Sequence, residues 1–113
     1  MPMPRDLPDP LIDLIAQRLR VLGDPMRIRI LNRLRGGEAS VQELVGATGG
    51  SQQNVSKHLS ILASAGIVRR HKEGTRSVYA IADAGVFDLC ERVCGGLQRQ
   101  LSELNDLMEG IVP

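Results

Sequence analysis

The chain has 113 residues, which suits one domain with a modest core. It contains one Phe, one Tyr and no Trp, so the core must be aliphatic, and this favours packed helices over a β-sandwich. Two cysteines exclude a disulfide scaffold, and no apolar run approaches the roughly 20 residues that span a bilayer. We therefore expect a soluble, cytoplasmic protein with reduced thiols and no membrane partner.

The formal net charge of +1 conceals an uneven distribution of charge. Residues 27–35 hold four arginines and no acid, and residues 51–76 hold five basic residues and one acid. Residues 82–113 instead hold two arginines and six acids. One basic run is usually a solvated helix face, but two of them followed by an acidic tail favour a side that faces a polyanion.

Helical periodicity begins after a Pro-rich arm. Residues 1–9 are expected to be extended, and they lack the apolar segment of a signal peptide. Apolar residues recur at helical spacing over residues 10–22, and Gly23 ends this first helix. Asp24 and Pro25 predict the cap and the first turn of a second helix. The predicted buried face of the second helix consists of Ile28, Ile30, Leu31 and Leu34.

Two further helices follow, separated by a tight turn at residues 47–50. Ser40 and Glu43 have the spacing of a capping box, which predicts a short helix after Ser40. Ser51 predicts the cap of the next helix, which runs to about Ala65. One face of that helix is apolar, with Val55, Leu59 and Leu62. Its opposite face is dense in hydrogen-bonding groups, from Gln52, Gln53, Asn54, Ser56, Lys57 and Ser60.

The period then changes to the alternation of strands over residues 67–72 and 77–81, with Glu73-Gly74 in the turn. Asp83 predicts the cap of a last helix over about residues 84–108. The apolar stripe of this helix has coiled-coil spacing and consists of Val86, Cys90, Val93, Leu97, Leu101, Leu104, Met108 and Ile111. A small domain cannot cover so long a stripe, so a second copy of the chain is the expected cover. The role of Gly95-Gly96 within the helix is open, either a kink or a close helix crossing.

A short helix, a tight turn and a second helix with a polar face form the helix-turn-helix pattern. In that pattern the second helix enters the major groove, where amide, hydroxyl and ammonium groups bond base edges. The hairpin that follows carries Arg69, Arg70, Lys72 and Arg76 around a Gly turn, which suits a wing that contacts phosphates. The simpler alternative is a helical hairpin with a solvated face.

Four motifs in this region resemble the ArsR/SmtB family of winged-helix repressors. Residues 22–34 match the family pattern L-x-D-P-x-R-x-x-I-L-x-x-L, and residues 51–59 match S-Q-x-x-V-S-x-H-L. Residues 65–68 match A-G-I-V, and residues 73–79 match the wing pattern E-G-x-x-x-x-Y. The resemblance covers about 60 residues, and the flanking helices agree with it.

This resemblance implies a mainly α fold with a small β-hairpin, a winged helix-turn-helix in the order α-α-α-α-β-β-α. It implies a single domain over residues 10–113, dimerised through helices at about residues 10–22 and 84–109. Such a homodimer binds an inverted-repeat operator in double-stranded DNA and represses until an effector acts. The implied DNA contacts are Ser51, Gln52, Gln53, Asn54, Ser56, Lys57, His58, Arg70, Lys72, Thr75 and Arg76. Two roles stay open for His58, which could face the groove or support the helix. Two partners stay open for Arg27, which could pair with a phosphate or with an acid.

The ligand sets by which many members of this family bind metals are missing. Ser40-Val41-Gln42 stands where a Cys-x-Cys is familiar, Asp83-Ala84-Gly85 replaces an Asp-x-His, and no His follows His71. We therefore expect none of the usual family metal sites and no required cofactor.

Cys90 and Cys94 lie one helical turn apart, on one face of the predicted dimer helix. They are either small core residues or a thiol sensor. A sensor could bind a soft metal or metalloid, which prefers thiolates, or be oxidised.

Two other functional classes compete with a DNA-binding repressor. An enzyme is not expected, because the sequence suggests no Ser-His-Asp or Cys-His pairing and no phosphate-binding Gly loop. A winged helix used only for protein interaction would usually lose its basic wing and polar recognition helix, and both are present here. A repressor without an effector, in which the cysteines are structural, also remains an alternative.

Overall fold

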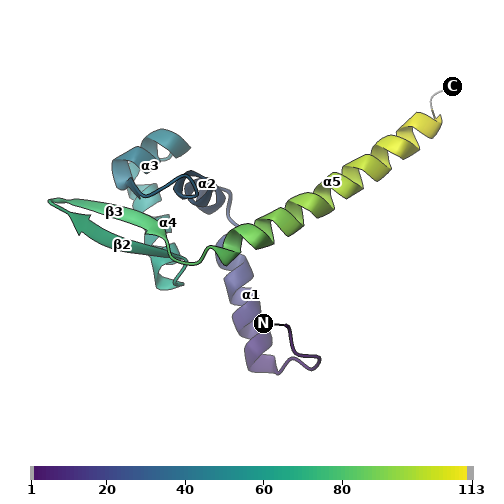
Figure 1. The fold of residues 1–113 in the computed structure, drawn as a ribbon, viewed down its shortest axis with the longest axis horizontal. Coiled ribbons are helices and arrows are strands. Elements are labelled where there is room, and N and C mark those ends of the chain that lie inside the picture. Colours follow the sequence, from purple (N-terminus) through teal and green to yellow (C-terminus); the bar gives the residue numbers. More distant parts are fainter. Residues whose placement is uncertain (1, 112–113) are drawn as a thin grey trace. The chain divides into compact units, whose positions relative to one another are not determined.

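Residues 2–111 are described in the computed structural model, and they divide into two compact units after Ala82 (Figure 1). The first unit contains α1 (Asp9–Leu22), α2 (Pro25–Leu34), β1 (Ala39–Ser40), α3 (Val41–Thr48), α4 (Gln52–Ser64), β2 (Val68–Glu73) and β3 (Arg76–Ile81). The second unit contains α5 (Gly85–Ile111). The predicted mainly helical fold with a small hairpin is confirmed.

Side-chain caps fix where α2 and α3 begin. Asp24 Oδ1 accepts hydrogen bonds from the amides of Met26, at 2.9 Å, and Arg27, at 3.2 Å. At the start of α3 the Glu43 amide donates to Ser40 Oγ, and the Ser40 amide donates to Glu43 Oε1, each at 3.2 Å. Both predicted caps are confirmed, and they satisfy amides that the helices cannot bond internally.

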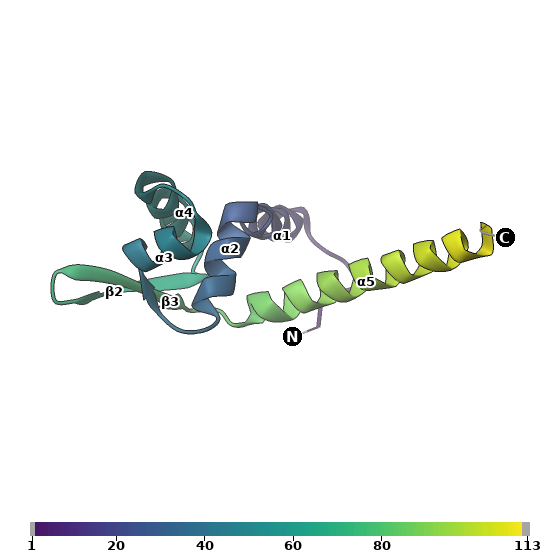
Figure 2. The ribbon, with the colours of Figure 1, turned by 90° about the horizontal axis from the view of Figure 1, so that it is seen from above.

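A tight turn joins α3 to α4, which pack against each other (Figure 2). Gly49 ends α3 in the left-handed conformation, with φ 76°, and its amide donates to the carbonyl of Val45 at 2.9 Å. A Cβ on Gly50 would lie 3.0 Å from Met26 Cε and 3.1 Å from Val55 Cγ2. Because this turn packs so closely against α2 and α4, a side chain at Gly50 would force its neighbours apart.

The three strands form an antiparallel sheet in the order β1-β3-β2. Glu73 pairs with Arg76 across a two-residue turn, in which Gly74 has φ 63°. The turn thus lies one residue later than predicted, because β2 extends to Glu73. Strand β1 was not predicted, and its two residues pair with Tyr79 and Val78. Two residues are too few to show an alternating pattern.

The core of the first unit is aliphatic, as the composition predicts. Its largest fully buried side chains come from α2, α3, α4 and the sheet, and they are Ile30, Leu44, Val55, Leu59, Leu62, Ile67 and Val78. The prediction that Ile28 is buried is wrong, because that side chain is 47% exposed. At about 100° per residue, the arc centred on Ile30, Leu31 and Leu34 includes Arg27 and leaves Ile28 outside it.

The second unit is one continuous helix of 27 residues, about 40 Å long. Asp83 Oδ1 accepts from the Gly85 amide at 3.0 Å, which confirms the predicted cap, and the helix runs unbroken through Gly95-Gly96. The predicted stripe is buried at Val86 and exposed in the single chain from Cys90 onward, through Val93, Leu97, Leu101, Leu104 and Met108. The side chain of Ile111, also predicted for this stripe, lies outside the described residues.

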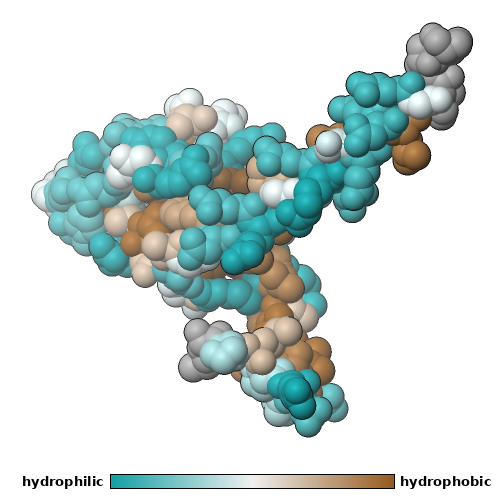
Figure 3. Space-filling model, turned by 45° about the vertical axis from the view of Figure 1, so that its right-hand side comes forward, coloured by the Kyte–Doolittle hydropathy of each residue, from teal (hydrophilic) through white to brown (hydrophobic). Residues whose placement is uncertain are grey.

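Apolar side chains also lie on the surface of α1 (Figure 3). Ile12, Leu14 and Leu19 are 44%, 67% and 50% exposed, and in α1 the one buried residue is Leu22. Within residues 2–111 no helix combines the length and the apolar character needed to cross a bilayer.

Candidate nucleic-acid interface

The start of α4 is fixed by Ser51, whose Oγ accepts a hydrogen bond from the Asn54 amide at 3.1 Å. This bond leaves the hydroxyl proton of Ser51 free to be donated outward. The buried face of α4 anchors the helix in the core through Val55, Leu59 and Leu62. The opposite face is open to solvent, with Gln52, Gln53, Lys57 and Ser60 exposed and Asn54 and Ser56 partly exposed.

His58 differs from the other predicted contacts of α4. Its side chain is buried, and its Nε2 lies 3.9 Å from Asp24 Oδ1 at the start of α2. Of the two roles left open for His58, the geometry therefore supports the one in which it braces α4 against α2. Its Nδ1 is buried without a hydrogen-bond partner in the described structure.

Asp24 is the centre of this link between α2 and α4. Its Oδ2 lies 3.9 Å from Arg27 Nη2, and the Arg27 side chain is 15% exposed. Arg27 therefore pairs with an acid, which was one of its two predicted partners. The hydrogen bond from the Arg27 amide lowers the pKa of Asp24 below the ordinary value, and the charges of His58 and Arg27 lower it further against the opposing effect of desolvation.

The hairpin of β2 and β3 forms the predicted wing, and its basic side chains are exposed. Arg69 Nη1 donates to the carbonyl of Ile81 at 3.1 Å, and Arg70 Nε donates to Ser77 Oγ at 3.1 Å. These bonds hold the two guanidinium groups along the hairpin. Lys72 and Thr75 are exposed near its turn.

Arg76 makes a contact that the sequence did not reveal. Its Nη2 lies 2.8 Å from Glu43 Oε1, and Glu43 Oε2 lies 3.6 Å from Arg33 Nη2. Glu43 thus connects the wing to α3 and α2 in addition to closing the capping box. The hydrogen bonds from the backbone and side chain of Ser40 lower the pKa of Glu43, and Arg76 contributes to the same shift.

A polar hollow of about 360 Å³ lies where the starts of α3 and α4 meet the wing. Three predicted contacts line it, Gln52, Thr75 and Arg76, together with Gln42 and Ser77, which were not predicted. All five side chains can donate hydrogen bonds. The hollow therefore has the chemistry to hold oxygen atoms of a phosphate backbone.

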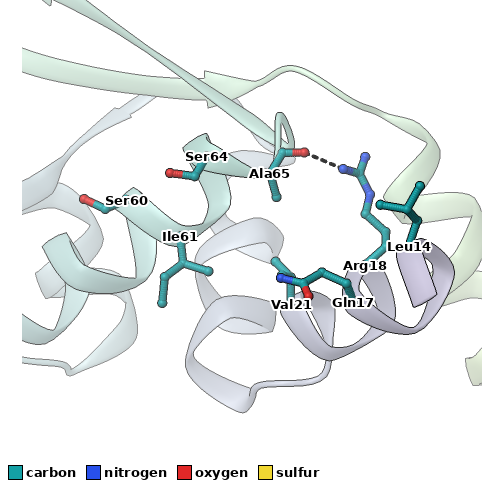
Figure 4. A pocket seen from close by; sticks show the side chains of 8 residues that line it. All are labelled: Leu14, Gln17, Arg18, Val21, Ser60, Ile61, Ser64 and Ala65. Carbon is teal, nitrogen blue, oxygen red and sulfur yellow. Dashed lines mark hydrogen bonds between the residues drawn. The ribbon is translucent and has the colours of Figure 1, made fainter. Parts of the chain in front are cut away.

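A second hollow, of about 500 Å³, lies between α1 and the later part of α4 (Figure 4). It is mainly apolar, with Leu14 and Val21 from α1 and Ile61 from α4. Arg18 Nη1 donates to the carbonyl of Ala65, which caps the end of α4. Ser60, which belongs to the polar face of α4, lines this hollow, but none of the predicted DNA contacts does.

Cys90 and Cys94 are both free thiols, and both are exposed in the single chain. They are four residues apart on α5, which places them on one side of that helix. Burial as core residues would therefore require another surface to cover them.

Comparison with known proteins agrees with this geometry. A helix-turn-helix domain family matches residues 22–71. The HTH-type transcriptional repressor SmtB of Mycobacterium tuberculosis is 39% identical over 82 residues, 73% of this chain and 58% of that relative. The protein named "Probable mercury resistance operon repressor" in Streptomyces lividans is 38% identical over 77 residues, 68% of this chain and 62% of the relative. The chain thus spans less than two thirds of the length of both relatives.

A solved structure extends the similarity over most of the chain. It is the homodimeric winged helix-turn-helix DNA-binding domain of Mb0332 from Mycobacterium bovis, a possible ArsR-family transcriptional regulator. It has a TM-score of 0.73 and 32% identity, and the match covers 91% of this chain and 95% of that one. The first relative is named a transcriptional repressor and Mb0332 a possible ArsR-family regulator, and the shared fold is a DNA-binding fold, not that of an enzyme.

Proposed function

The chain belongs to the ArsR/SmtB family of winged helix-turn-helix repressors, and on this basis we propose that it binds an inverted-repeat DNA operator as a homodimer and represses transcription. One observation carries the proposal, which is the exposed polar face of α4 beside a basic hairpin. The opposite face of α4 is fully buried, so this helix is presented in a single orientation.

The groove contacts would come from the first turns of α4. Gln52, Gln53 and Asn54 carry amides that suit adenine edges, and Lys57 can reach guanine or a phosphate. The wing would contribute Arg70, Lys72 and Thr75 to backbone contacts that fix position without reading sequence. Arg76 would act from its position beside Glu43, within the polar hollow.

Dimerisation would cover the exposed apolar residues of α1 and α5. The stripe of α5 from Val93 to Met108 is too long to remain in water, and the Mb0332 domain is homodimeric. Two α4 helices must lie about 34 Å apart to enter successive major grooves.

Leu101→Glu places a charge in the apolar stripe of α5, so we expect it to dissociate the dimer and to weaken operator binding. Sedimentation would measure the oligomeric state of this variant, with Glu103→Gln as the control.

The salt dependence of binding separates this proposal from a protein-interaction module. A DNA-binding wing loses affinity steeply as salt rises, because phosphate contacts release counterions. The test is the affinity for promoter DNA between low and moderate salt, measured by fluorescence anisotropy. Absence of binding at low salt would favour the interaction module.

We propose that effector release acts through Cys90 and Cys94. Their thiolates could bind a soft metal or metalloid, and the similarity to the mercury resistance repressor supports that class of ligand. Oxidation is the alternative chemistry, and structural cysteines without an effector are the alternative role. Cys90→Ser and Cys94→Ser proteins should bind the operator but fail to release it on addition of mercuric ion, arsenite or peroxide. Release of both variants by the same compounds would contradict a thiol sensor.

A regulator that binds the operator of its own cell must act where that DNA lies. We accordingly propose a cytoplasmic location, in which the two thiols would be kept reduced. Fractionation of the cells that produce the protein, followed by immunoblotting, would test it.

A further inference from the structure

Three potential metal ligands converge beside the wing, away from both cysteines. His71 Nε2 lies 3.4 Å from Glu38 Oε2 and 3.7 Å from Glu73 Oε1. The three ligand atoms all lie within 4.8 Å of one another, and all three side chains are exposed. Glu38 directly precedes β1, whereas His71 and Glu73 belong to β2. The cluster therefore spans the sheet, in which β3 separates these two strands.

The distances agree with the edges of a zinc coordination shell. Bonds of about 2.0–2.2 Å from zinc to nitrogen and oxygen place the ligand atoms of a tetrahedron about 3.3–3.6 Å apart. The two distances from His71 to the glutamates are already close to this range. The two carboxylate oxygens lie within 4.8 Å of each other, and exposed glutamate side chains can adjust that separation.

Two neighbouring cations are held or directed away from these carboxylates. Arg76 is paired with Glu73 in the strand register, but its guanidinium lies 2.8 Å from Glu43. Lys72 lies between His71 and Glu73 in sequence, and alternation along the strand directs it to the opposite face of the sheet. Imidazole and carboxylate are also ligands that suit zinc and similar divalent ions.

We propose that Glu38, His71 and Glu73 form a binding site for a divalent ion of the zinc class, with water in the remaining position. The forms that bind a metal are a neutral imidazole nitrogen and ionised carboxylates, so protons compete with the ion for the same ligand atoms.

The site has a consequence for DNA binding, and this step rests on the proposed function. Glu73 places negative charge on a hairpin that must approach phosphates, and Glu38 places a further negative charge beside His71 of that hairpin. A bound divalent ion cancels this charge and ties the strand residues together across β3. We therefore expect the ion to raise operator affinity severalfold, which is opposite in sign to release by an effector at the cysteines.

The test is a titration with Co²⁺, which reports its coordination through visible absorption, followed by competition with Zn²⁺. The starting protein carries Cys90→Ser and Cys94→Ser, so thiolates cannot contribute. We compare it with His71→Gln, Glu38→Gln and Glu73→Gln in the same background. Glu103→Gln, an exposed acid on α5, is the matched control.

We expect saturable binding of Co²⁺ that Zn²⁺ displaces, weakened about tenfold or more by His71→Gln and also weakened by each glutamate substitution. Glu103→Gln should leave the affinity unchanged. Equal affinities for the His71→Gln protein and its parent, or no saturable binding, would overturn the site. No DNA is present in this titration, so a negative result would rule out the metal site without bearing on the proposed DNA binding. A second experiment measures the affinity for operator DNA by fluorescence anisotropy, with and without the ion. If the ion does not raise that affinity, the proposed effect of the metal site on DNA binding by the wing is overturned.

Discussion

Asp24 shows how one side chain can support a recognition helix to which it does not belong. Its carboxylate caps α2 through the amides of Met26 and Arg27, and the same group faces His58 on α4. Glu43 has a similar double role, since it closes the capping box of α3 and holds Arg76 of the wing. The orientation of the DNA-facing groups thus depends on acids that would not themselves contact DNA.

Removal of the Asp24 carboxylate should reduce the free energy of unfolding. Loss of a helix cap typically costs about 1 kcal/mol, and Asp24→Ala also leaves the largely buried Arg27 without its acid. We therefore expect a loss of at least about 1 kcal/mol in urea unfolding. Asp13→Ala, at an exposed position of α1, should change stability by less than about 0.5 kcal/mol. Equal effects of the two substitutions would contradict the role of Asp24.

Acid should weaken the fold through the same two carboxylates. The pKa values of Asp24 and Glu43 are lowered in the folded protein. Each group therefore contributes stability above its ordinary unfolded pKa and loses that contribution as pH falls through the lowered pKa. We expect the free energy of unfolding to decrease below about pH 4 to 5, measured by urea titrations at a series of pH values. A protein with Asp24→Asn and Glu43→Gln should show a shallower decrease, and an unchanged slope would refute this assignment.

Helix α4 and the wing have different roles in the proposed recognition of DNA. The amides of α4 would read base edges, whereas the basic groups of the hairpin would contact phosphates. The polar hollow between them collects residues from α3, α4 and the wing at one place. These two elements should therefore respond differently to substitution.

We expect Gln53→Ala and Lys72→Ala to produce distinct binding defects. Gln53→Ala should cost about 1–3 kcal/mol on a cognate site and little on random DNA, because a base contact is lost. Lys72→Ala should weaken binding to both kinds of DNA and lower the salt slope by about one unit. Anisotropy at several salt concentrations measures both effects, with Glu109→Gln on α5 as a control. A sequence-independent defect in Gln53→Ala would place that residue off the groove.

The local order of elements could be predicted because caps and periodicity are written in consecutive residues. Asp24, Ser40, Ser51 and Asp83 all cap helices at their predicted positions. The pairing of Arg76 with Glu43 could not be predicted, because it joins residues 33 apart and Glu43 already had a local explanation. The burial of His58 depends on how α2 crosses α4, which helical periodicity alone does not determine. The Glu38–His71–Glu73 cluster was missed because β1 was missed.

The proposed function requires two chains. In a single chain the apolar side chains of α1 and α5 are exposed to water, which is unfavourable. A symmetric dimer presents two copies of α4, and its two-fold axis should be reflected in the DNA as an inverted repeat. Each chain contributes one wing, which would add affinity beside its own half-site.

Selection of binding sites from random duplex DNA tests whether two copies of α4 read two half-sites together. The enriched sequences should contain an inverted repeat with half-site centres about 10 base pairs apart, because each α4 enters one of two successive major grooves. Insertion of about half a helical turn between the half-sites should then abolish tight binding by rotating them onto opposite sides of the duplex. Enrichment of a single asymmetric half-site, or binding that ignores the insertion, would contradict the paired presentation of α4.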